Sequence, residues 1–181
     1  ERIWPDGTLL PHALGTVGPI TAEQWETLEG TGIAMDADIG QSGLEAAYES
    51  LLHGTDGRVR VTTGDAGVIA EEETREPQPG ATLVLSLDAG FQRSVQTALT
   101  DYLHTLQTTK AAGSGREANA GAVVVVDVET GGILAAANSP SYDLSTYRSN
   151  YAALAADASA PLLDRVTQGL YAPGSAFKPA V

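Results

Sequence analysis

Residues 121–137 read GAVVVVDVETGGILAAA, two apolar runs joined by a short polar turn. Gly121–Val128 and Gly132–Ala137 are rich in β-branched or small apolar residues, and Glu129-Thr130-Gly131 separates them. This pattern predicts an antiparallel β-hairpin. Val123–Val126 is apolar without alternation, so we expect that strand to be covered on both faces, or nearly so.

A long helix is predicted immediately before this hairpin. Asp88 is a favourable N-cap residue, and we expect the helix to span 88–107 and to pack against the hairpin. Ala111–Glu117 should form the connecting loop, and Thr82–Leu87 should form a strand ahead of the helix. The apolar positions of the helix recur at about 3.6 residues and are Phe91, Val95, Leu99, Tyr102, Leu103 and Leu106.

Two capping-box patterns predict short helices nearer the amino terminus. Thr21-Ala22-Glu23-Gln24 should open a helix that ends near Leu28, and Ser42-Gly43-Leu44-Glu45 should open another that reaches Leu52. Gly54 then occupies a position that favours left-handed backbone.

Three further stretches give weaker predictions. Arg58–Thr62 alternates like a half-buried strand, and the turn Gly64–Gly67 follows it. Glu71–Gly80 is charged and interrupted by proline, so we expect a solvated loop. A short helix is expected at Ala152–Ala156.

The composition excludes several functions. The 181 residues include 23 acidic and 10 basic side chains, for a net charge of -13, which argues against nucleic-acid binding by counterion release. Without cysteine there is no disulfide or thiolate metal site. The apolar runs are shorter than the roughly 20 residues that span a bilayer. The amino terminus also lacks a secretory signal, and we expect the chain to be a piece of a longer protein.

The pair most suited to chemistry is Ser175 and Lys178, in the S-x-x-K element of Pro173–Pro179. On a helix these side chains share one face, so the Lys178 amine could take the Ser175 hydroxyl proton if its pKa is lowered. A helix amino terminus would supply N–H groups to a developing oxyanion. The alternative is a capped helix with a solvated lysine. His12, His53 and His104 lack metal-ligand or general-base spacing, so structural or surface roles are expected for them.

These residues resemble a known family. Residues 163–179, LDRVTQGLYAPGSAFKP, resemble the segment that leads into the active-site serine of penicillin-binding proteins. The hairpin 121–137 resembles the opening strands of their transpeptidase domain. Residues 11–18 and 39–49 resemble the dimerisation or pedestal domain of the class B, monofunctional branch.

The resemblance implies an α+β fold, in which an elongated pedestal domain at 1–80 precedes the incomplete first strands and helices of a transpeptidase domain at 81–181. It implies that Ser175 is the acyl-accepting nucleophile and Lys178 its proton acceptor in D,D-transpeptidation of peptidoglycan stem peptides. β-Lactams would acylate the same serine, and no metal or organic cofactor is implied. The family's later S-x-N and K-[ST]-G elements would lie beyond Val181, so we expect the 181-residue chain to be inactive.

The resemblance also implies partners and a location. The pedestal would contact a polytopic glycosyltransferase, outside the bacterial cell membrane, in a protein held by an anchor that this chain lacks. No nucleic-acid partner is expected. Incomplete sheets should expose edges and apolar faces, which the isolated chain could cover by dimerising. Two alternatives are a purely non-catalytic interaction module and a related D,D-carboxypeptidase or penicillin-sensing receptor.

Overall fold

The computed structural model describes residues 2–64, 67–172, 175 and 178 and divides the chain into two compact units. One unit comprises Glu1–Ala13 and Ser86–Val181, and the other comprises Leu14–Leu85. The described strands form antiparallel pairs, and helices accompany them in both units, so the predicted α+β class is confirmed. The predicted boundary between a pedestal domain at 1–80 and a transpeptidase domain at 81–181 separates functional domains, and it stays a prediction.

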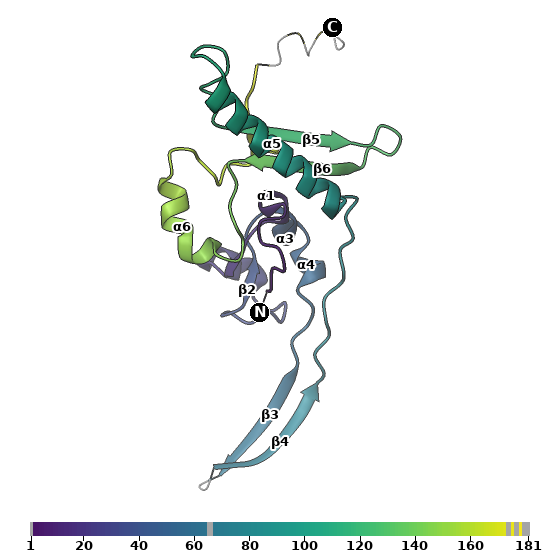
Figure 1. The fold of residues 1–181 in the computed structure, drawn as a ribbon. Coiled ribbons are helices and arrows are strands. Elements are labelled where there is room, and N and C mark those ends of the chain that lie inside the picture. Colours follow the sequence, from purple (N-terminus) through teal and green to yellow (C-terminus); the bar gives the residue numbers. More distant parts are fainter. Residues whose placement is uncertain (1, 65–66, 173–174, 176–177, 179–181) are drawn as a thin grey trace. The chain divides into compact units, whose positions relative to one another are not determined.

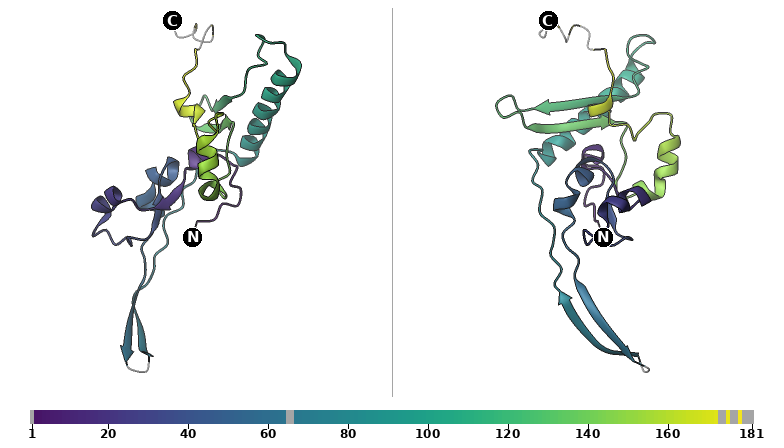
Figure 2. Two further views of the ribbon diagram at one scale, coloured as in Figure 1. Left: turned by 90° about the vertical axis from the view of Figure 1, so that its left-hand side faces the viewer. Right: turned by 180° about the vertical axis from the view of Figure 1, so that it is seen from behind.

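The larger unit is built on a helix and a hairpin. Helix α5 (Ala89–Thr109) begins after Asp88, whose carboxylate accepts a hydrogen bond from the Phe91 N–H. Strands β5 (Gly121–Val126) and β6 (Ile133–Ser139) pair antiparallel, and α5 runs along them (Figures 1 and 2). The predicted helix, hairpin and packing are therefore confirmed. The core comprises Leu99, Leu103 and Ala137, with Val95, Ala118 and Val123 packed against it.

The other face of the hairpin is open among the described residues. Val124 and Val126 are 44% and 48% exposed, because alternate side chains of a strand point to opposite faces and only one face meets α5. The prediction that Val123–Val126 is covered on both faces is therefore wrong. The expected exposure of apolar side chains on this sheet is confirmed.

Glutamine side chains of α5 satisfy backbone groups of β6. Gln92 is 1% exposed; its Nε2 donates to the Ala136 carbonyl at 2.9 Å, and its Oε1 accepts from the Ala136 N–H at 2.7 Å. Gln96 donates to the Asn138 carbonyl at 2.8 Å. Alternate residues of an antiparallel strand direct these groups to the same side, so the two glutamines cover one edge of β6.

The predicted apolar stripe of α5 holds only in part. Leu99 and Leu103 are buried, whereas Phe91 and Tyr102 are 42% and 62% exposed. The most buried side chain of the helix is Gln92, a polar residue that the apolar periodicity did not include.

The smaller unit contains the two capping-box candidates, and they behave differently. Thr21 and Gln24 form the predicted reciprocal box at the start of α2 (Ala22–Leu28). Ser42 occupies the N-cap position of the next helix but makes no side-chain capping bond, because its hydroxyl accepts from the Thr16 N–H and bonds the Thr16 hydroxyl, both at 3.0 Å. The prediction of a second capping box is therefore wrong.

The helix predicted from Ser42 to Leu52 is broken at Tyr48. It forms as α3 (Gly43–Ala47) and α4 (Glu49–Leu52). Gly54 follows with φ of +78°, which confirms the predicted left-handed position. Ahead of these helices, β1 (Val17–Pro19) pairs with β2 (Asp38–Gly40).

A second hairpin lies in this unit, formed by β3 (Arg58–Gly64) and β4 (Gly67–Arg75) (Figure 1). Side chains 58–63 are exposed on both faces, so the predicted half-buried strand is wrong about burial. The predicted loop at Glu71–Gly80 is wrong as far as Arg75, because pairing with β3 brings these charged residues into a strand. Part of the predicted turn, residues 65 and 66, lies outside the described residues.

Several elements complete the description. Helix α6 (Tyr147–Ala156) contains the predicted Ala152–Ala156 segment, and the Ala111–Glu117 loop is confirmed. Residues 82–87, all described, form no strand, which contradicts that prediction. The elements that were not predicted include the short helices α1 (Pro11–Leu14) and α7 (Arg165–Gln168) and strand β2. In the part of the chain that the structure describes, no helix is long and apolar enough to cross a membrane.

Candidate active site

Ser175 and Lys178 are both exposed, and each has 3₁₀-helical backbone conformation. The residues between them lie outside the described part of the chain. The assignment of the serine as nucleophile and the lysine as base stays a prediction. What the structure does describe is how the chain approaches this pair.

Helix α7 ends at Gln168, seven positions before Ser175. Asp164 caps it: one carboxylate oxygen accepts from the Val166 N–H at 3.1 Å, and the other accepts from the Thr167 hydroxyl at 2.5 Å. This short helix therefore starts from a defined side-chain cap.

Asn138, near the end of β6, connects that strand to α7. Its Oδ1 accepts from the backbone N–H groups of Arg165 and Val166 at 2.7 and 3.1 Å. Its Nδ2 donates to Asp164 at 3.0 Å, and the residue is 5% exposed. A buried amide with its oxygen and one N–H bonded in this way fixes the start of α7 to the sheet.

Arg165 ties the same helix to the loop that precedes it. The residue is 7% exposed, and its guanidinium donates to the carbonyls of Ala160 at 2.9 Å and Ser159 at 2.6 Å. Planar, multiple donors make arginine suitable for holding several carbonyl oxygens together.

His12 reaches the same loop from the amino-terminal segment. Its Nε2 lies 2.8 Å from the Pro161 carbonyl, and it must be the donor because a carbonyl only accepts. Burial lowers the pKa of His12, so the neutral form is favoured. The ring meets Tyr142 edge-on at 4.9 Å, and burial, followed by the charges of Tyr147 and Asp164, raises the pKa of Tyr142 to about 12. These contacts give His12 the structural role expected from the sequence.

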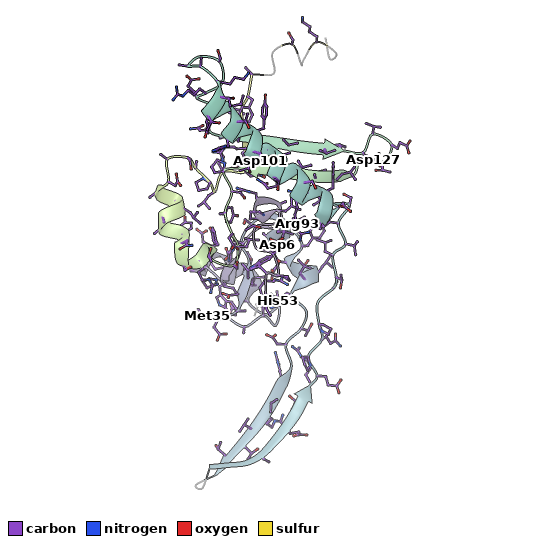
Figure 3. The ribbon with its side chains drawn as sticks, in the orientation of Figure 1. Asp6, Met35, His53, Arg93, Asp101 and Asp127 are labelled. Carbon is purple, nitrogen blue, oxygen red and sulfur yellow. The ribbon has the colours of Figure 1, made fainter. Side chains whose placement is uncertain are left out.

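Other contacts hold the amino-terminal segment in this unit. Asp6 and Arg93 form an ion pair at 3.0 Å, visible in Figure 3, and the Leu144 N–H donates to the Gly7 carbonyl at 2.9 Å. A hydrogen bond from Thr8, followed by one from Arg93, lowers the pKa of Asp6.

The other two histidines differ in their contacts. The Nδ1 of His53 lies 2.6 Å from a Glu49 carboxylate oxygen, a partner that was not predicted from the sequence, and His104 is exposed on α5. Among the residues that the structure describes, no group of three or more His, Asp or Glu side chains could hold a metal ion.

Comparison with protein families accounts for most of the chain. The model of the penicillin-binding protein dimerisation domain matches residues 1–85, and the model of the penicillin-binding protein transpeptidase domain matches residues 121–181. The chain belongs to the penicillin-binding protein family. The predicted order, a pedestal or dimerisation domain followed by the start of a transpeptidase domain, is confirmed.

Individual penicillin-binding proteins agree with this assignment. The chain is 36% identical over 191 residues to the peptidoglycan D,D-transpeptidase MrdA of Escherichia coli K12, which it matches over its whole length while covering 28% of that protein. The MrdA of Acinetobacter baumannii is 33% identical, with 98% of this chain and 25% of the relative covered.

Solved penicillin-binding proteins share the fold. PBP2 from Helicobacter pylori superposes with a TM-score of 0.71 at 26% identity, over 99% of this chain and 32% of that one. Penicillin-binding protein 2X from Streptococcus thermophilus gives a TM-score of 0.57 at 26% identity, over 93% and 20%. The chain thus spans less than a third of the length of these relatives.

The S-x-x-K element was recognised in the sequence, whereas the residues that fix the segment leading to it were not. Asn138 and Asp164 are 26 positions apart, so no local pattern joins them. One signal was present: Asp164 followed by Thr167 has the form of a helix cap, and it could have indicated α7.

Proposed function

We propose that Ser175 is the nucleophile of a penicillin-binding D,D-transpeptidase and that Lys178 accepts its proton. The observation that carries the proposal is the S-x-x-K element inside the matched transpeptidase domain, at the end of a segment that Asn138 and Asp164 fasten to β6. The names of the relatives support the same reaction class.

In the proposed reaction, the Ser175 oxygen attacks the carbonyl carbon of a D-Ala–D-Ala peptide bond as its proton passes to the Lys178 amine. The tetrahedral intermediate collapses, the bond to the terminal D-Ala breaks, and that amine leaves with a proton. An amine of a neighbouring stem peptide then attacks the Ser175 ester and releases the serine. A β-lactam would acylate the same oxygen by opening its ring. No metal or organic cofactor takes part.

The amino-terminal region has a different role in this proposal. Residues 1–80 act as a pedestal that positions residues 81–181 and contacts a polytopic glycosyltransferase on the outer side of the cell membrane, in a membrane-anchored parent protein. The match to a dimerisation domain supports an interaction role. The isolated chain would dimerise through apolar side chains such as Val124 and Val126, which are exposed.

The 181-residue chain alone should lack activity. In the proposed enzyme the S-x-N and K-[ST]-G elements, which complete the proton relay and the substrate groove, come from sequence after Val181. Residues 1–181 would then hold a serine and a lysine without a complete site.

Labelling with a fluorescent penicillin tests the proposal. We expect no useful labelling of residues 1–181, clear labelling of the full-length protein that contains them, and loss of that labelling in Ser175→Ala. Labelling of the short chain would contradict its expected inactivity. Labelling that persists in the full-length Ser175→Ala variant would contradict the assignment of the nucleophile.

A further inference from the structure

The contact between Asn138 and Asp164 joins the two parts of the larger unit that matter for the approach to Ser175. Asn138 belongs to β6, which α5 holds through the backbone contacts of Gln92 and Gln96. Asp164 is the N-cap of α7, after which the chain runs on to Ser175. The pair therefore links β6 to the segment that carries the proposed nucleophile.

In this contact the donor and acceptor atoms of Asn138 face different partners. The Asn138 oxygen faces two backbone N–H groups, at 2.7 and 3.1 Å, while its N–H group faces the Asp164 carboxylate at 3.0 Å. An aspartate at position 138 would still accept from both N–H groups, but it would place a second carboxylate against Asp164. Like charges at hydrogen-bond distance, one of them buried, repel strongly.

We propose that Asn138 and Asp164 are positioning residues that set the place of Ser175 by fixing the start of α7 to β6; this inference rests on the proposed role of Ser175. In this proposal neither residue touches the substrate. Their effect falls on the rate at which a bound β-lactam acylates the serine, because a misplaced nucleophile slows the chemical step while the binding groove is unchanged.

A purely structural role would have a different signature. It would lower the fraction of folded protein or its melting temperature, and the folded molecules would react at the normal rate. The first-order acylation constant and the non-covalent dissociation constant of a fluorescent penicillin separate the two cases, since both are measured on folded protein by stopped-flow fluorescence.

The experiment uses the full-length protein and exchanges the two polar groups. We expect Asn138→Asp to lower the acylation constant by about tenfold or more, with the dissociation constant within about twofold, as for a displacement of the reacting groups. Asp164→Asn alone should have a small effect, because an asparagine can still accept from the Asn138 amide. The double variant Asn138→Asp with Asp164→Asn restores one donor and one acceptor, and its acylation constant should return to within about threefold of the original.

Asn150→Asp is the matched control, since Asn150 is exposed on α6 and the substitution is the same. It should leave both constants unchanged. If Asn138→Asp does not fold, Asp164→Ala replaces it, because this part-exposed position tolerates truncation better; it removes the cap and the Asn138 partner and should lower the acylation constant by about threefold or more.

The outcomes separate the two proposals. An unchanged acylation constant in Asn138→Asp, or no recovery in the double variant, overturns the positioning role while labelling still depends on Ser175. Labelling that survives Ser175→Ala instead overturns the proposed function. A changed dissociation constant together with an unchanged acylation constant in Asn138→Asp also contradicts the positioning role.

Discussion

The two hairpins of this chain have the same topology and different surroundings. Both β3–β4 and β5–β6 are antiparallel pairs of strands that follow one another closely in the sequence. Helix α5 covers one face of β5–β6 and its glutamines cover an edge, whereas side chains 58–63 of β3 are exposed on both faces. Strand pairing is therefore a local property here, and burial depends on what the rest of the chain supplies.

The difference has an energetic consequence. A two-stranded hairpin alone is at best marginally stable in water, because it buries little apolar surface. The layer formed by α5 with β5–β6 buries Leu99, Leu103 and Ala137 and satisfies backbone groups of β6. We expect the stability of the chain to depend on this layer and to be insensitive to substitutions in β3–β4.

The largest effect is expected for Leu103→Ala. It removes a core side chain that is 8% exposed, and should lower the free energy of unfolding by about 3 kcal/mol. The matched change Val61→Ala, at a β3 position that is 49% exposed, should stay within about 0.5 kcal/mol. Urea titrations followed by circular dichroism measure both. Equal losses of unfolding free energy in the two variants would contradict the proposed difference between the two hairpins.

A smaller loss is expected for Gln92→Leu. The substitution leaves the part-buried Ala136 N–H and carbonyl without their partner, which should cost about 2 kcal/mol. Gln107→Leu is the control, because it removes one exposed contact, to Ala118, and should cost about 0.5 kcal/mol or less. If the urea midpoint of Gln92→Leu equals that of Gln107→Leu, covering the β6 edge does not stabilise the layer.

The smallest effect is a dependence on pH. Burial lowers the pKa of His12 in the folded chain below its ordinary value of 6.5, so the unfolded chain binds the proton more readily. Stability from neutral His12 is therefore fully present above pH 6.5 and is lost as the pH falls from there through the lowered value. His12→Gln keeps a donor for Pro161 and should flatten the melting temperature across this range.

The control for His12 is the exposed His104 on the same unit. His104→Gln should leave the pH profile of the melting temperature as it is in the original chain. A His12→Gln profile with the original slope would show that His12 does not contribute to acid destabilisation.

Elements defined by neighbouring residues were predictable from the sequence. The capping box at Thr21, the cap at Asp88 and the turn between β5 and β6 all depend on residues a few positions apart. The failures have tertiary causes. Ser42 has the pattern of a cap, but Thr16, 26 positions away, takes its hydroxyl.

Strand predictions failed for a related reason. Residues 82–87 alternate in burial but find no strand to pair with among the described residues, whereas the charged run Glu71–Arg75 becomes a strand because β3 pairs with it. A strand requires a partner, and the choice of partner is not encoded within a short window.

The candidate site shows the same division. Ser175 and Lys178 are three positions apart in the sequence, so the S-x-x-K element is recognisable there, and the roles of the two residues stay a prediction. Asn138, Asp164 and Gln92 act through contacts that join distant parts of the chain, and apolar periodicity passes over polar residues that become buried. These contacts could therefore not be predicted from the sequence.

The proposal that Ser175 forms the acyl-enzyme is tested most directly by locating the covalent adduct. The full-length protein is treated with penicillin and digested with trypsin, which cleaves after Arg165 and leaves the Lys178–Pro179 bond intact, and the peptides are sequenced by mass spectrometry. We predict a penicilloyl adduct on Ser175, in the peptide that begins at Val166. An adduct on another residue, with Ser175 unmodified, would contradict the account.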